Sequence, residues 1–237
     1  QGAIGFEGTS ADKTFLFTVE AYYKDLANLY EYREDANFAY SSNYEDQLTI
    51  GRGEAYGVEM FFNKRIGNIT GWFGYTLSWT KRYFDNLNRS VGFYPQFDRR
   101  HDLSLVLSWQ ATGALSFAAT WNYSTGKAFP LPVMQYSFLT MSDPKDNAQD
   151  VFYEYSARDA FRLPAFHKLD ISINWAFDWG ENKAELSLNI YNVYNRYNVF
   201  SKYVGYKIDE VTGIRTPVLK QFTLYPFLPS IGLKVHF

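Results

Sequence analysis

Histidine and carboxylate side chains stand close together at two places in this sequence, and such pairs can act as general acids and bases. One is the run Asp98–Asp102, which reads Asp-Arg-Arg-His-Asp, and the other combines His167, Asp170 and Ser172. His167 and Asp170 point to opposite sides of a strand, which argues against a catalytic triad. The first run lacks a nucleophile at a matched position, so an ion-paired cluster at the start of a strand explains it better. We therefore expect no catalytic residues.

Other polar groups give equally little reason to expect a metal or a cofactor. Glu54 and Glu59 stand five residues apart, so on a strand they face opposite sides and act as separate wall residues. The acidic segment 143–150 supplies oxygen ligands without the glycine and terminal glutamate of a calcium loop. The chain has no cysteine, which excludes disulfides and thiolate metal sites.

The composition points away from several protein classes. Net charge is −2 with both signs interspersed, so nothing suggests a nucleic-acid partner. The sequence contains no apolar run of about 18 residues, which excludes a transmembrane helix, and its start has no signal peptide. Aromatic residues make up 20% of the chain and tyrosine and phenylalanine dominate them. Tyrosine and tryptophan favour places with one dry and one wet side, such as membrane interfaces.

Period-two alternation is the main structural signal. In segment 167–190, HKLDISINWAFDWGENKAELSLNI, apolar residues alternate with small or polar ones on both sides of the turn at 180–183, which predicts an antiparallel hairpin. Similar segments recur along the whole chain. We expect nine strands, at Gly2–Gly8, Thr14–Arg33, Asp46–Arg65, Ile69–Phe84, Phe97–Thr112, Ala114–Phe129, Phe161–Trp179, Lys183–Tyr203 and Val218–Phe237.

The lengths of strands and connections favour a membrane barrel over a soluble β-sandwich or propeller. The predicted strands are longer than the average strand of a soluble protein, which has about five or six residues. Connections near 9–13, 67–68, 112–113 and 180–183 are short, whereas those near 31–45, 85–96, 130–160 and 204–217 are long. Short turns on one side and long loops on the other are typical of a transmembrane antiparallel up-and-down β-barrel, with the short turns in the periplasm.

This all-β barrel has a predicted facing for its side chains. The residues expected to face lipid are Leu103, Leu105, Leu107, Ile171 and Ile173. The residues expected in a periplasmic aromatic girdle are Trp72, Trp109, Trp175, Trp179 and Phe237. The loop aromatics pack loop against loop, form an upper aromatic girdle, or bind a ligand from outside. The loop tyrosines proposed as ligand-binding are Tyr40, Tyr44, Tyr94, Tyr136, Tyr153 and Tyr155.

Several stretches resemble the C-terminal strands of TonB-dependent outer-membrane receptors, particularly the SusC-like receptors of Bacteroidetes-type bacteria. These stretches are 51–84, 94–109, 161–177, 188–198 and 227–237, and together they span nearly the whole chain. The resemblance implies a barrel of about 22 strands with a plug domain inside it. Residues 1–237 would then be the C-terminal part of that barrel, about nine strands, without the plug and the TonB box.

The resemblance also implies a function and a set of partners. The expected function is ligand-gated, TonB-energised import of a siderophore, cobalamin, glycan or peptide across the outer membrane. The expected partners are the remainder of the barrel, the plug domain, the TonB complex, the lipid bilayer, the barrel-assembly machinery that reads the terminal Phe237, and in some relatives a surface lipoprotein lid. The alternatives are a passive porin, an outer-membrane enzyme and a soluble carbohydrate-binding β domain.

Overall fold

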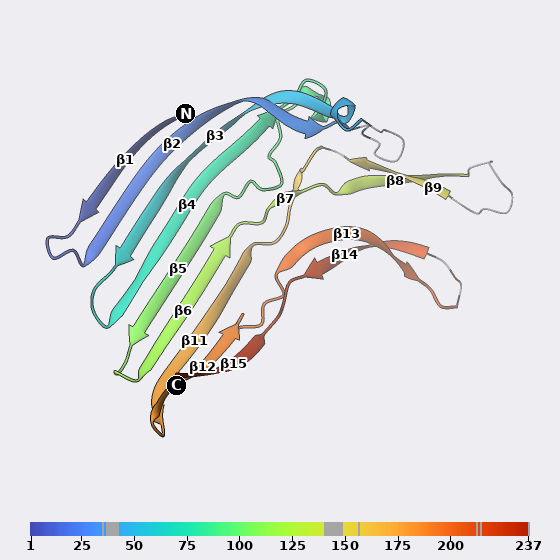
Figure 1. Ribbon diagram of the computed structural model, residues 1–237. Coiled ribbons are helices and arrows are strands. Elements are labelled where there is room, and N and C mark those ends of the chain that lie inside the picture. Colours follow the sequence, from blue (N-terminus) through green and yellow to red (C-terminus); the bar gives the residue numbers. More distant parts are fainter. Residues whose placement is uncertain are drawn as a thin grey trace.

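The protein forms one curved antiparallel sheet of nine strands with three two-stranded ribbons at one end (Figure 1). The structure is a computed structural model that describes residues 1–34, 36, 43–139, 149–155, 157–211, 213 and 215–236. Along the sheet the strands are β1 (Gly2–Thr9), β2 (Phe15–Tyr32), β3 (Leu48–Lys64), β4 (Ile69–Tyr83), β5 (His101–Gln110), β6 (Leu115–Ser124), β11 (Phe166–Trp179), β12 (Asn182–Tyr191) and β15 (Leu228–His236).

The ribbons lie in the long connections. They pair β7 (Ala128–Phe129) with β10 (Phe161–Arg162), β8 (Pro132–Leu139) with β9 (Gln149–Tyr155), and β13 (Val199–Ile208) with β14 (Arg215–Thr223). The helical segments of the described chain are two short 3-10 turns, η1 (Glu45–Gln47) and η2 (Asn88–Ser90). Within the described residues, no helix has the length and apolar character needed to cross a membrane.

Local chemistry explains the tight turns at the lower end of the sheet in Figure 1. In the β1–β2 turn, the Asp12 carboxylate accepts hydrogen bonds from Ser10 Oγ at 2.5 Å, from Thr14 Oγ1 at 2.6 Å and from Thr14 N at 3.1 Å. These hydrogen bonds lower the pKa of Asp12 to about 2. Gly180 takes a φ of 64° between β11 and β12, a conformation that favours glycine. Both turns therefore reverse the chain without long loops.

The strand register gives the sheet one apolar and one polar face. Direct neighbours across six strands form an apolar row of Ile69, Trp109, Phe117, Ile173, Leu188 and Ile231. The next row, on the opposite face, consists of Thr70, Ser108, Ala118, Ser172, Asn189 and Ser230. Side chains of a strand alternate between faces, so this register extends the contrast along every strand.

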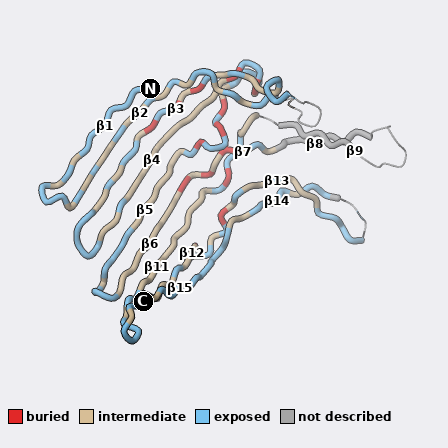
Figure 2. Tube along the Cα trace, viewed as in Figure 1, coloured by how far each residue is buried: buried red, intermediate tan, exposed pale blue. Residues whose placement is uncertain are grey.

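The buried apolar residues do not lie between two layers. Phe84, Leu87 and Phe93 form a buried cluster in the β4–β5 connection, and Leu29 packs against it. Leu29 reaches the cluster because β2 has a bulge between Leu26 and Leu29, with Asn28 at a φ of 55°. Figure 2 shows the buried positions gathered toward the upper end of the sheet, whereas the strands below are half-buried or exposed. We call the cluster of Phe84, Leu87 and Phe93 the loop core.

The predicted all-β class and the nine antiparallel strands of the main sheet are confirmed, but four strand boundaries were wrong. The strands β2, β3 and β4 are long, with 18, 17 and 15 residues, whereas β5, β6 and β12 have 10 each. Segment 183–203 is not one strand, because β12 ends at Tyr191 and β13 begins at Val199 in a separate ribbon. Likewise, 114–129 divides into β6 and β7, 161–179 into β10 and β11, and 218–237 into parts of β14 and β15.

Gly126 marks the place where the chain leaving β6 meets the chain returning to β11. A Cβ atom at Gly126 would lie 1.5 Å from the carbonyl oxygen of Leu163. Leu163 N donates to Lys127 O at 3.0 Å, so the two segments are also hydrogen-bonded here. Only a residue without a side chain allows this approach of two backbones.

We predict that Gly126→Ala destabilises the protein by about 1–3 kcal/mol, because the methyl group must displace backbone rather than a flexible side chain. Denaturant unfolding, followed by tryptophan fluorescence, measures the change. Gly113→Ala is the matched control, since a Cβ there meets nothing within 4 Å. Equal unfolding midpoints for the two variants would show that the crossing is not tight.

Candidate functional site

The apolar face of the main sheet is a candidate interaction surface. The register places Leu103, Leu105 and Leu107 of β5 on this face, together with Ile171 and Ile173 of β11. Many residues of the face remain exposed, from Leu107 at 44% to Ile231 at 77%. A contiguous apolar surface of this extent marks a site of contact with protein or membrane.

Aromatic side chains border the apolar face at the end with the short turns. The rings of Trp109 and Phe117 stack with centroids 5.3 Å apart. Phe177 lies between Trp175 at 4.9 Å and Trp179 at 6.3 Å. These positions match the expected girdle, and tryptophan suits a boundary between apolar and polar surroundings.

Trp72 does not belong to this border. It pairs with Asn63 and Val106 and shares the polar face with Gly74 and Thr76. Its ring contacts Phe61 across the strands at 6.0 Å. The sequence was ambiguous here because Trp72 and Phe73 are adjacent aromatic residues, which must lie on opposite faces of the strand. Phe73 is the one that lies on the apolar face. The girdle residue Phe237 lies outside the described residues.

A second aromatic row crosses the apolar face toward the long loops. Tyr56 stacks between Tyr23, at 6.4 Å, and Trp79, at 5.3 Å. The guanidinium of Arg100 lies 4.6 Å from the centre of the Trp79 ring. Two aromatic rows therefore bound the apolar face along the strands, and the upper one adjoins a cation.

The polar face contains shallow hollows rather than a deep pocket. The larger hollow, of about 320 Å³, lies over β2–β5, and Phe61 and Trp72 are among the residues that line it. Its rim carries the carboxylates of Glu20 and Glu59, which stand directly opposite each other across β2 and β3. A second hollow of about 230 Å³ lies over β6, β11 and β12 and includes Asp170 and Ser172.

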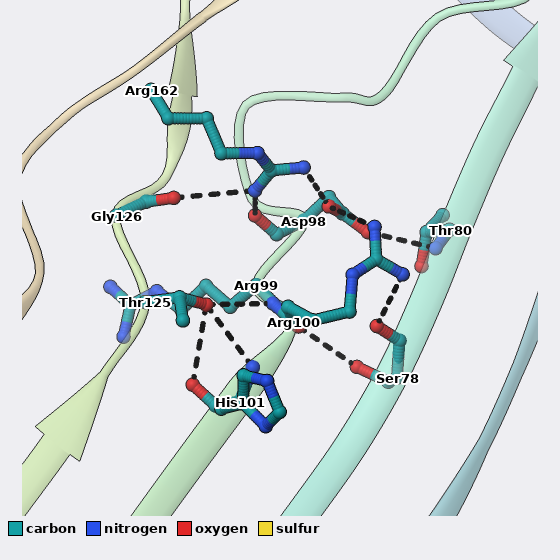
Figure 3. Close-up of polar contacts among 9 residues, drawn as sticks. All are labelled: Ser78, Thr80, Asp98, Arg99, Arg100, His101, Thr125, Gly126 and Arg162. Atoms are coloured by element: carbon teal, nitrogen blue, oxygen red, sulfur yellow. Dashed lines mark hydrogen bonds and ion pairs between the residues drawn. The ribbon is translucent and has the colours of Figure 1, made fainter.

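The predicted ion-paired cluster at 98–102 is confirmed, and its centre is Asp98 (Figure 3). The side chain of Asp98 is 1% exposed, and its Oδ1 accepts a hydrogen bond from Thr80 N at 2.8 Å. Its Oδ2 pairs with Arg162 and, at 3.7 Å, with Arg100. A buried carboxylate requires such partners, because an unpaired charge would cost several kcal/mol in the interior, of the order of 3–5 kcal/mol.

The remaining residues of the run do not assemble an acid–base site. His101 Nδ1 lies 2.8 Å from the hydroxyl of Tyr75, not beside a carboxylate. Asp102 pairs with Arg99 at 3.5 Å. Thr125 Oγ1 accepts hydrogen bonds from the backbone N–H groups of Arg100 and His101, at 2.8 and 3.1 Å. The run therefore anchors the start of β5 to the end of β6.

The second group considered for catalysis is also dispersed. His167 Nδ1 lies 2.8 Å from the Tyr194 hydroxyl, Asp170 pairs with Lys168, and Ser172 Oγ donates to Asn189 at 2.6 Å. Each side chain thus has a different partner. Glu54 and Glu59 lie on opposite faces as expected, with Glu54 accepting a hydrogen bond from the Tyr83 hydroxyl at 2.7 Å. Among the described residues, no group of three histidine and acidic side chains is arranged to hold a metal.

Two of the six tyrosines proposed for ligand binding can be placed. Tyr44 precedes η1 and is 64% exposed. Tyr94 is 37% exposed, and its ring lies 5.4 Å from the guanidinium of Arg100 and 5.5 Å from that of Arg162. The ring of Tyr94 is therefore part of the packing around the Asp98 cluster.

The other four tyrosines have no described side chain. Tyr40 lies outside the described residues, and so do the side chains of Tyr136, Tyr153 and Tyr155, whose backbones form β8 and β9. Their ligand-binding role stays a prediction.

Sequence analysis missed a second polar anchor at the end of β12. Asn192 is fully buried, and its amide donates to Arg196 O at 2.8 Å and to Tyr225 O at 3.3 Å. Asn192 N donates to Asp170 at 2.9 Å, and Asn198 Nδ2 donates to His167 O at 2.9 Å. These bonds fix the turn from β12 into β13 against β11. Asparagines repeated at every third position, 189 to 198, were the available signal.

These features define the chain as part of the wall of an antiparallel β-barrel of the outer-membrane kind. The family described as "TonB dependent receptor-like, beta-barrel" matches residues 3–193. The chain belongs to this family. TonB-dependent receptors have a plug domain, interact with TonB and lie in the outer membrane of Gram-negative bacteria.

A solved structure agrees with this assignment. The closed form of the ferric-catecholate import receptor Fiu from E. coli K12 is similar to this chain with a TM-score of 0.54 and 17% identity. The similarity covers 99% of this chain and 27% of the Fiu chain, so the chain spans about a quarter of that receptor's length. Identity this low shows a shared fold only. A comparison with curated proteins gives no match.

The facing of the two surfaces can be tested on β11. Ile173 lies midway along the apolar row from Leu169 to Trp179, with Phe117 and Leu188 as neighbours. We predict that Ile173→Arg destabilises the full-length receptor by about 2–4 kcal/mol, because the cation enters lipid. Folded fraction in outer membranes and denaturant unfolding in lipid measure the effect.

Asn174→Arg is the matched variant. Asn174 lies on the polar face between Ser116 and Ser187, so the same charge should be tolerated there with a much smaller loss. The pair Leu105→Arg and Ser104→Arg repeats the comparison on β5. If the polar-face variants collapse the protein and the apolar-face variants fold normally, the facing is inverted and the apolar face has a protein core against it.

Proposed function

We propose that this chain is a wall segment of a TonB-energised importer of the outer membrane. The observation that carries the proposal is the apolar face, which runs across the main sheet opposite a polar face and is bounded by two aromatic rows. In this arrangement lipid covers the apolar face. The polar face lines the interior, and the long connections lie outside the cell.

The proposal extends to the place of the chain in the receptor. We propose that it forms the C-terminal part of a barrel of about 22 strands, with a plug domain elsewhere in the same protein. Two observations support this: the similarity to 27% of the Fiu chain, and the unpaired outer edges of β1 and β15 in the main sheet. The resemblance of several motifs to SusC-like receptors supports a Bacteroidetes-type source and, as in some of these receptors, a surface lipoprotein partner.

Uptake measurements test the importer function. We predict that a strain without the full-length receptor loses uptake of one nutrient class, from a panel of siderophore-bound iron, cobalamin, oligosaccharide and peptide. A strain without TonB should lose the same uptake to the same extent, since the imported ligand needs energy. Labelled substrate accumulated per cell is the readout. Uptake that persists without TonB would identify a passive pore instead.

The opposed carboxylates of Glu20 and Glu59 support a plug in contact with the polar face. Like charges directly opposite on neighbouring strands destabilise a sheet. Within the described chain, neither carboxylate has a hydrogen bond or ion pair with another residue. Asp102 lines the same hollow. A cation contributed by another part of the receptor would relieve this repulsion, and the interior plug is the partner in position to supply one.

We predict that replacing Glu20 and Glu59 together by glutamine lowers the unfolding midpoint of the full-length receptor, because a plug cation loses its partners. Without a cation there, the same change removes repulsion and stabilises the sheet by about 0.2–1 kcal/mol. The sign of the shift in the denaturant unfolding midpoint therefore decides whether a plug cation contacts Glu20 and Glu59. Glu54→Gln is the control, since Glu54 is on the same strand as Glu59, β3, but on the opposite face of the sheet.

A further inference from the structure

The β8–β9 hairpin leaves the sheet on a stalk of two segments, and the returning segment carries two arginines that pair with carboxylates outside the stalk. In the described chain, β8 and β9 pair only with each other. The outgoing segment runs through Gly126 to β7, and the returning segment, 157–163, runs through β10 to β11. Figure 1 shows the hairpin extending beyond the upper end of the main sheet. Whatever fixes the returning segment therefore fixes the direction of the hairpin.

Arg162 is the first anchor of the returning segment. Its Nη1 donates to the carbonyl oxygens of Asp98, at 2.9 Å, and Gly126, at 3.2 Å, while Nη2 pairs with the Asp98 carboxylate. The planar guanidinium thus joins both stalk segments to the β4–β5 connection (Figure 3). The same carboxylate holds Arg100, at the start of β5.

Arg158 is the second anchor, and its arrangement repeats the first. Its Nη2 pairs with Glu31 Oε1 at 3.1 Å, and the other oxygen of Glu31 pairs with Arg82 at 3.0 Å. The backbone N of Arg158 donates to Asn88 Oδ1 at 2.8 Å. The guanidinium lies 5.4 Å from the ring of Phe93, a member of the loop core.

The two anchors share one design. Glu31 and Asp98 each join one arginine at a strand end, Arg82 near the end of β4 or Arg100 just before β5, to one arginine of the stalk. Both carboxylates are well shielded, with side chains 22% and 1% exposed, so the ion pairs are weakly screened by solvent. Loss of one stalk arginine leaves its carboxylate with one partner fewer and releases one attachment of the stalk.

We propose that Arg158 and Arg162 are positioning residues that fix the direction in which the β8–β9 hairpin leaves the barrel wall, each by sharing a carboxylate with an arginine of the sheet. The proposal concerns the attachment of the hairpin and holds whatever ligand the receptor takes. We call this set of ion pairs the latch; it consists of the carboxylates of Glu31 and Asp98 and the guanidinium groups of Arg82, Arg100, Arg158 and Arg162.

Hydrogen exchange of the full-length receptor in lipid nanodiscs tests the latch. The variant carrying Arg158→Gln and Arg162→Gln should exchange the stalk amides of 128–129 and 161–163 at least tenfold faster than wild type. The amides of β5 and β6 and the unfolding midpoint should change little, which a general loss of structure would not allow. Arg162→Lys keeps the charge without the fork of donors, and should give an intermediate rate.

Arg99→Gln is the matched control. Arg99 lies next to the cluster, but its side chain contacts Ser124, at 2.9 Å, and Asp102, at 3.5 Å, both in the sheet and neither in the stalk. Stalk exchange at the wild-type rate in the double variant would overturn the proposal, as would equal acceleration by Arg99→Gln. Should the double variant not assemble, each single variant is measured, and an increase of less than threefold in both would equally overturn it.

Discussion

Pairing of backbone N–H and C=O groups between neighbouring strands is the constraint on which this structure depends. A backbone group left unpaired in hydrocarbon costs several kcal/mol, roughly the loss of a full hydrogen bond, so a wall exposed to lipid must be a continuous hydrogen-bonded sheet. Continuity from β1 to β15 fixes the register, and the register sorts side chains into an apolar and a polar face. The tight turns with Asp12 and Gly180 preserve that register by allowing no slack between strands.

The loops follow a different rule from the wall. In the proposed arrangement lipid covers the wall in place of a second protein layer, whereas the connections above it must exclude water for themselves. They do so with the loop core of Phe84, Leu87 and Phe93 and with arginines that each contact several segments. Polar anchoring is strongest where strands end, at Asp98 beside β5 and at Asn192 after β12. Wall and loops thus meet along a line of buried polar groups.

Much of the wall could be predicted from the sequence, because a period of two assigns each residue of a strand to a face. Alternation put Leu105 and Ile173 on one face, and the register places both on the apolar face, while their contact with lipid stays a prediction. Trp72 was misplaced because its neighbour Phe73 is also aromatic, and only the register with β5 chooses between them. The break between β12 and β13 was missed because apolar and aromatic residues continue through 190–203, whereas the turn depends on bonds from Asn192 to Arg196 and Tyr225.

The ion-pair partners of Asp98 and Glu31 could not be predicted from the sequence. The run 98–102 is visible as a group of charges, but the partner of Asp98 is Arg162 and the partner of Glu31 is Arg158. Such pairs form only after the long connections have folded back onto the sheet. No local sequence pattern predicts these pairs, because the sequence around a loop arginine does not indicate whether the arginine has a partner.

The location of the loop core has a consequence for the thermodynamics of unfolding. Exposure of apolar surface to water is what raises the heat capacity when a protein unfolds. The buried apolar cluster of the described chain lies in the connections, and in the proposed arrangement the apolar face of the wall already meets lipid. Melting of the loops should therefore carry most of the heat-capacity increment of this segment. Cooling would then weaken the loops before the wall, since hydrophobic burial in water loses strength at low temperature.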